Sequence, residues 1–104
     1  MLTLPIKGLW FHKIKKGLKL EEYREIKPYY VTRFQNVWKG HYNTPKWIRL
    51  RQGYNGSSPE IYILCTLSIG RGRQEWGAEP KKDYYVLRIL EVSEENPMKG
   101  ETDG

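Results

Sequence analysis

Apolar and polar residues alternate along several short segments of this chain, a pattern typical of half-buried β-strands. Strands are predicted at residues 2–6, 47–51, 61–69 and 84–92. The strand at 61–69 is the clearest, because every second residue is apolar: Ile61, Ile63, Cys65, Leu67 and Ile69. In the first segment, Pro5 cannot donate a backbone hydrogen bond, so that strand is expected at a sheet edge or strand end.

Two other segments have the three- and four-residue apolar spacing of amphipathic helices. The first helix is predicted over residues 8–16 and stops before Gly17; its apolar residues are Trp10, Phe11 and Ile14. The second is predicted over residues 29–38, with Pro28 placed to begin it; its apolar residues are Tyr30, Phe34, Val37 and Trp38. Four or five short strands with one or two helices predict an α+β fold, a small mixed β pseudo-barrel with helices packed outside.

Residues 19–26 allow two interpretations. As a strand, they place Leu20, Glu22, Arg24 and Ile26 on one face and Lys19, Glu21, Tyr23 and Glu25 on the other. As a helix, they would form a mixed-charge surface helix. Tyr23, Ile26 and the following Pro28 favour the strand. A partly buried face with Glu22 and Arg24 needs these charges to pair, to line a cleft, or both, because burying an unpaired charge is costly.

Positive charge is concentrated in the first half of the chain. Residues 1–52 contain twelve Lys or Arg and three Glu, a balance of +9, whereas residues 53–104 contain six basic and nine acidic residues, a balance of −3. Aromatic residues are interleaved with the basic ones, which favours a polyanion such as single-stranded nucleic acid as partner. The alternative is that the lysines only solvate the surface.

Cysteine and histidine usage points away from metal chemistry. Cys65 is the single cysteine, which excludes an intrachain disulfide and a cysteine metal cluster, and His12 and His41 lack partners at metal-ligand spacing. No cofactor or metal is therefore expected. The sequence has no signal-peptide pattern and no apolar stretch near the ~18 residues of a membrane span, so we expect a cytoplasmic protein without membrane contact. One domain is predicted over residues 1–92, followed by a flexible acidic tail at 93–104.

The first candidate site has the spacing G-x-K-x-x-E-x-R from Gly17 to Arg24. Glu22 can accept hydrogen bonds from the exocyclic amine of a base, and Arg24 can hold Glu22 or bind phosphate. Lys19 can contact phosphate, or act as a base if it is desolvated. A structural ion pair beside a surface lysine accounts for the same residues equally well.

Two further groups are candidates for nucleic-acid contacts. The second group offers stacking and phosphate contacts, or else ordinary outward residues of a strand: Trp47, Arg49, Arg51 and Tyr54. The third lies in the long loop at 70–83, whose length favours a functional role and which does not have a helical pattern: Arg71, Arg73, Glu75 and Trp76. Trp76 can serve as a stacking platform or as a hydrophobic plug.

From residue 4 to residue 92 the chain resembles the ASCH family, a branch of the PUA-like fold, especially its small stand-alone bacterial and phage members. The resemblance is carried by LPIKGLWFHKIKKGLKLEEYREIKPYY, which contains the G-x-K-x-x-E-x-R motif, and by RLRQGY and GRGRQEWGAEP. It implies a pseudo-barrel with helices around a cleft that binds RNA or a nucleotide and is lined by the motif.

Some ASCH relatives are amidohydrolases that act on N4-acetylcytidine. Their proposed catalytic set includes a lysine matching Lys19 and a threonine where this chain has Glu22. Glu75 is a candidate for a further catalytic glutamate. Because the threonine is absent, the expected function is an RNA- or nucleotide-binding module, and hydrolysis of a modified nucleoside or of RNA is the alternative.

Overall fold

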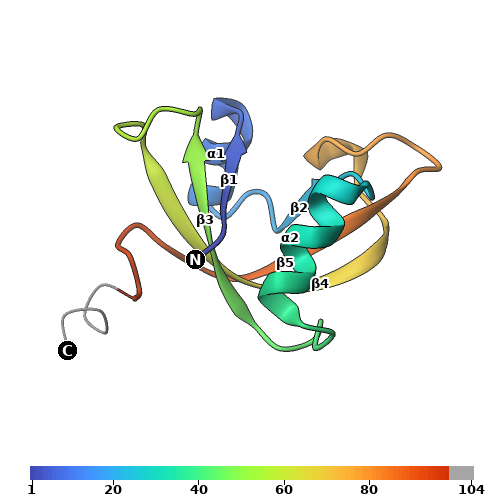
Figure 1. Ribbon diagram of the computed structural model, residues 1–104. Helices are drawn as coiled ribbons and strands as arrows, with labels where there is room; N and C mark the ends of the chain where they lie inside the picture. Colours follow the sequence, from blue (N-terminus) through green and yellow to red (C-terminus); the bar gives the residue numbers. More distant parts are fainter. Residues whose placement is uncertain (99–104) are drawn as a thin grey trace.

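The computed structural model describes residues 1–98 of the chain (Figure 1). Within them lie two helices, one turn of 3-10 helix and five strands: β1 (Thr3–Ile6), α1 (Gly8–Lys15), β2 (Glu21–Arg24), α2 (Pro28–Trp38), β3 (Lys46–Gln52), β4 (Glu60–Arg71), η1 (Gln74–Trp76) and β5 (Asp83–Ser93). No helix of residues 1–98 is long and apolar enough to cross a membrane.

The five strands form one mixed sheet in the order β1-β3-β4-β5-β2. β1 pairs with β3 in parallel, and the other pairs are antiparallel. The long strands β4 and β5 curve, with a register shift near Leu64 and Cys65, so that the sheet curls into a half-barrel (Figure 1). The predicted α+β pseudo-barrel with flanking helices is confirmed, and its edge strands are β1 and β2.

Each helix buries part of the apolar face that its spacing predicted. Phe11 and Ile14 of α1 and Phe34 and Trp38 of α2 are buried in one core with the inward residues of the sheet. The ring of Phe34 meets that of Tyr85 edge-on at 5.0 Å between centroids. The core thus holds both helices against the sheet.

Gly17 ends α1 as the sequence predicted. Its φ of 75° lies in the left-handed region, which glycine adopts without strain. The N–H of Gly17 donates to the carbonyl of Ile14 at 3.0 Å, and that of Leu18 donates to Lys13 at 2.8 Å, the Schellman arrangement. This turn directs the chain from α1 toward β2 and places Lys19 between them.

Three apolar residues assigned to the buried faces are instead exposed. Leu20 and Ile26 flank β2, which spans only residues 21–24, so strand alternation does not extend to them. Ile69 is 56% exposed, because the first residue of β3, Lys46, pairs with Cys65, so β4 beyond Cys65 has no strand beside it on that side. The same alternation placed Lys19 outward, whereas its side chain is buried.

The predicted acidic tail is only partly described. Ser93 is the last residue of β5, and the next residue, Glu94, pairs with Lys15 of α1 at 3.1 Å. Residues 99–104, the second half of the predicted flexible tail, lie outside the described residues.

Candidate functional site

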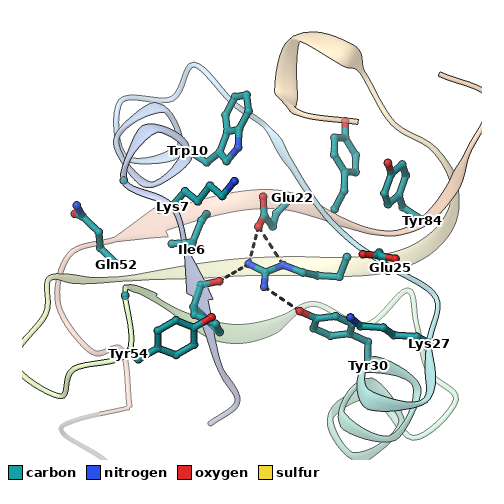
Figure 2. Close-up of a pocket in the computed structure, with 15 residues that line it drawn as sticks. Ile6, Lys7, Trp10, Glu22, Glu25, Lys27, Tyr30, Gln52, Tyr54 and Tyr84 are labelled. Carbon is teal, nitrogen blue, oxygen red and sulfur yellow. Dashed lines mark hydrogen bonds and ion pairs between the residues drawn. The ribbon is translucent and has the colours of Figure 1, made fainter. Parts of the chain in front are cut away.

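A pocket of about 800 Å³ lies at the seam between the edge strands β1 and β2 (Figure 2). Its lining comes from β1 and the start of α1, from β2 and the start of α2, from the end of β3 with the loop that follows it, and from the start of β5. Because β1 and β2 are the two outermost strands of the sheet, the pocket occupies the gap that a closed barrel would fill with backbone hydrogen bonds. Its size is that of a small-molecule site.

Arg24 spans this seam. It donates to Glu22 Oε2 from Nε at 3.1 Å and from a terminal nitrogen at 2.7 Å. The same terminal nitrogen donates to the carbonyl oxygen of Pro5 in β1 at 2.7 Å, and the other terminal nitrogen donates to the Tyr30 hydroxyl of α2 at 3.3 Å (Figure 2). Burial acts to lower the pKa of Arg24, but Glu22 and Tyr30 outweigh it and the pKa is raised. Arg24 therefore stays charged and links β2, β1 and α2.

Lys19 holds the other oxygen of the same carboxylate. Its Nζ lies 3.1 Å from Glu22 Oε1, donates to the carbonyl oxygen of Trp76, and sits 4.2 Å from the ring centroid of Trp10. Lys19 is 2% exposed and Glu22 5%. Burial lowers the pKa of Lys19, and the nearby carboxylate of Glu22 only partly opposes this. Lys19 lies behind Glu22 and is not among the pocket-lining residues.

The floor of the pocket keeps some hydrogen-bonding capacity. Arg24 uses four of its five N–H groups in the contacts described above. Glu22 Oε1 receives Lys19, and a carboxylate oxygen has room for a second donor. Since Glu22 and Arg24 both line the pocket, the floor offers a ligand one strong acceptor beside one donor.

Aromatic side chains and lysines surround this floor. The aromatic lining residues are Trp10, Tyr23, Tyr30, Tyr54 and Tyr84. Tyr54 is 89% exposed in the loop that follows β3. Lys7 and Lys27, which directly precede α1 and α2, are exposed at the mouth. A planar ligand could therefore stack inside while its charged parts stay outside.

The loop at 72–82 braces the site from behind. A Cβ on Gly72 would lie 2.7 Å from the ring of Tyr23, so this loop packs directly on β2. The backbone N–H of Arg73 donates to the Tyr23 hydroxyl at 2.9 Å, and the Trp76 indole N–H donates to the carbonyl of Leu18 at 3.1 Å. These contacts set the Trp76 carbonyl against Lys19.

The second predicted group is divided by the fold. Tyr54 lines the pocket, whereas Trp47, Arg49 and Arg51 do not. Arg51 donates to Glu60 Oε2 at 2.8 Å, and the Nε of Arg49 lies 3.7 Å from the same oxygen. Glu60 thus partly balances both arginines.

The third predicted group also lies away from the pocket. Arg71 pairs with Asp83 at 2.9 Å and Arg73 with Glu75 at 3.6 Å, and all four side chains are mostly exposed. Arg73 also sits 5.0 Å from the ring centroid of Trp76. Neither Glu75 nor Trp76 lines the pocket; the role of Trp76 here is the backbone contact to Lys19. η1 makes a helical turn where no helical pattern was predicted.

Several lining residues escaped sequence reasoning. Trp10 and Tyr30 were assigned to helix faces toward the core, and Lys7, Lys27 and Tyr84 were given no role. One available signal was that Lys7 and Lys27 each stand directly before a predicted helix, the position where chain direction changes beside a sheet.

Metal-binding side chains do not gather in the described part of the chain. Among residues 1–98 there is no group of three or more His, Cys, Asp or Glu placed to hold an ion. Cys65 is buried, and this burial raises the pKa of its thiol to about 12, so the thiol is not a nucleophile at neutral pH.

Comparisons with protein-family models, with curated proteins and with solved structures gave no match for this chain. The class is therefore defined by fold and site alone: an α+β half-barrel whose open seam holds a pocket with a buried carboxylate.

Proposed function

We propose that this chain binds RNA, or a nucleotide within RNA, with the base in the pocket between β1 and β2. The observation that carries the proposal is the buried Glu22 carboxylate, which is fixed by two cations and lines the pocket floor. Unpaired bases present N–H groups on their edges, and a carboxylate accepts hydrogen bonds from them. The floor presents one acceptor, on Glu22 Oε1, beside the one N–H of Arg24 that has no partner, and the edge of a base offers such a donor and acceptor pair, so we place the base inward.

The walls and the charge of the protein support the same function. Trp10, Tyr30 and Tyr54 offer flat surfaces on which a base can stack. The net charge of +6 favours a polyanion. The resemblance of residues 4–92 to ASCH domains adds support, since the motif from Gly17 to Arg24 supplies the floor, and we propose membership of that family on this ground.

Substitution of Glu22 tests the proposal. Glu22→Gln keeps the size of the side chain and removes the charge, so we expect about 10- to 100-fold weaker binding, the loss of a charged hydrogen bond. Glu60→Gln is the matched control, because Glu60 also holds two arginines but does not line the pocket. Fluorescence anisotropy with labelled mixed-sequence single-stranded RNA measures both affinities.

Equal affinities for Glu22→Gln and the parent protein would contradict the proposal, as would no RNA binding by the folded parent. A folding defect in Glu22→Gln would be seen by circular dichroism. In that case Tyr54→Ala carries the test, because Tyr54 is 89% exposed and its removal leaves the core intact. Loss of its stacking should weaken binding by about 1–3 kcal/mol.

A hydrolase acting on N4-acetylcytidine, another modified nucleoside or RNA is the second candidate. The lowered pKa of Lys19 favours it, because an amine that is more easily deprotonated is a better general base. The contacts of Lys19 with Glu22 and Trp76, and its place behind the pocket lining, favour binding instead. Incubation with acetylcytidine and single-stranded RNA, followed by mass analysis, separates the two. Turnover that Lys19→Met abolishes would establish the hydrolase.

A further inference from the structure

The two lysines at the pocket mouth come from different sides of it. Lys7 stands between β1 and α1, and Lys27 stands between β2 and α2. Figure 2 shows them on either side of Glu22. Both are exposed, so their ammonium groups can follow a ligand that lies across the mouth.

Within residues 1–98, neither lysine has a carboxylate partner within 4 Å. The cations of the predicted contact groups do have such partners: Lys19 and Arg24 share Glu22, Arg49 and Arg51 share Glu60, and Arg71 and Arg73 pair with Asp83 and Glu75. Glu25 also lines the pocket, but its carboxylate lies 3.7 Å from Lys82. The unbalanced positive charge at the mouth therefore belongs to Lys7 and Lys27.

A free nucleoside 5′-monophosphate carries its phosphate on one side of the sugar only. A nucleotide inside a strand has a phosphate on each side of its sugar. We propose that the pocket takes an internal nucleotide of a single RNA strand, with its base on Glu22 and its two flanking phosphates at Lys7 and Lys27. This inference rests on the proposed function and adds the form of the ligand.

The base of such a nucleotide must be unpaired. Glu22 is 5% exposed, so only a base that has left its stack and its partner can reach the carboxylate. Sequence-specific proteins commonly contact RNA in loops and single strands, where bases can be splayed out in this way. The strand would cross the open seam between β1 and β2, with its backbone outside and one base inside.

Short ligands of defined length test this arrangement. The probes are the four homotrinucleotides of RNA without terminal phosphates, and the matching nucleoside 5′-monophosphates, titrated against the full chain by calorimetry. We expect the best trinucleotide to bind at least about tenfold tighter than its monophosphate. Its affinity should fall with salt with a log–log slope of about −1.4, since each phosphate contact on a single strand contributes about −0.7.

Removing either lysine should remove one of the two contacts. Lys7→Gln and Lys27→Gln should each reduce the slope for the trinucleotide to about −0.7. Lys16→Gln, at the far end of α1, and Lys46→Gln, at the start of β3, remove the same charge away from the pocket and should leave the slope unchanged.

The possible results distinguish the internal-nucleotide arrangement from the proposed RNA-binding function. A monophosphate that binds as tightly as its trinucleotide would overturn the internal-nucleotide arrangement and leave nucleotide binding in place. Slopes that do not change in Lys7→Gln and Lys27→Gln would also overturn it. If the folded protein binds none of the probes and also fails to bind longer single-stranded RNA at low salt, both the internal-nucleotide arrangement and the proposed RNA-binding function are overturned.

Discussion

Glu22 offsets part of the buried positive charge of this protein. Its carboxylate receives Lys19 on one oxygen and Arg24 on the other, and all three side chains are largely buried. Removal of one partner from a buried ion pair lowers the free energy of unfolding by about 3–5 kcal/mol, because the other charge stays buried away from water without a partner. Residue spacing correctly predicted Glu22 and Arg24 as an inward pair, but it placed Lys19 on the outer face. The backbone turns between Gly17 and the start of β2, so strand alternation does not apply to Lys19.

The pKa of Lys19 makes the stability of the protein depend on pH. Burial lowers this pKa in the folded state below the 10.5 of the unfolded chain. Between these two values the unfolded state binds more protons, so the free energy of unfolding rises with pH. The parent protein should gain stability relative to Lys19→Met as the pH increases toward 10.5. Urea denaturation at a series of pH values from 7 upward measures this, and a constant difference would contradict the prediction.

Among the elements, the loop at 72–82 has a structural role that the sequence did not indicate. A small cluster of Ala78, Tyr84 and Val86, with Tyr23 beside it, attaches the loop to β2 and β5. Gly77 adopts a φ of 102° and passes the Trp10 ring so closely that a Cβ would lie 3.0 Å away. The length of the loop predicted a functional role. Its packing shows instead that the loop holds Lys19 and Trp10 in place.

Gly72→Ala should loosen this loop. The added Cβ would lie 2.6 Å from Ala78 and 2.7 Å from the Tyr23 ring, so the loop must shift, at a cost of about 1–3 kcal/mol. Gly70→Ala is the control two residues away, because nothing lies within 4 Å of its Cβ position. Urea denaturation should show a lower midpoint for Gly72→Ala alone. Equal midpoints for the two variants would contradict this role of the loop.

The whole molecule is a half-barrel whose seam is bridged by a side chain. Backbone pairing ends at β1 on one side and at β2 on the other, and Arg24 joins them through the Pro5 carbonyl. An arginine suits this position because its planar group donates in several fixed directions at once. The open seam is also what leaves room for the pocket.

Arg24→Lys should therefore open the seam without removing the charge. A single ammonium cannot reach Glu22, Pro5 and Tyr30 together, so β1 and β2 lose their link. We expect amide hydrogens in β1 and β2 to exchange faster than in the parent protein. Amides in the buried centre of β4 should still exchange only through global unfolding. Uniform acceleration across the sheet would instead indicate a general loss of stability.

The sequence by itself determined the two α-helices and four of the strands and favoured a strand at β2, because apolar periods are properties of consecutive residues, whereas η1 had no such pattern. Pro28 and Gly17 marked a helix start and a helix end for the same local reason. Pro5 also predicted an edge position or strand end for β1, and β1 is an edge strand. Only the tertiary structure decided that β2 is the opposite edge, that Lys19 is buried, and that Lys7 and Lys27 both line one pocket. Each of these depends on which distant segments pack together, and residue spacing along the chain does not contain that information.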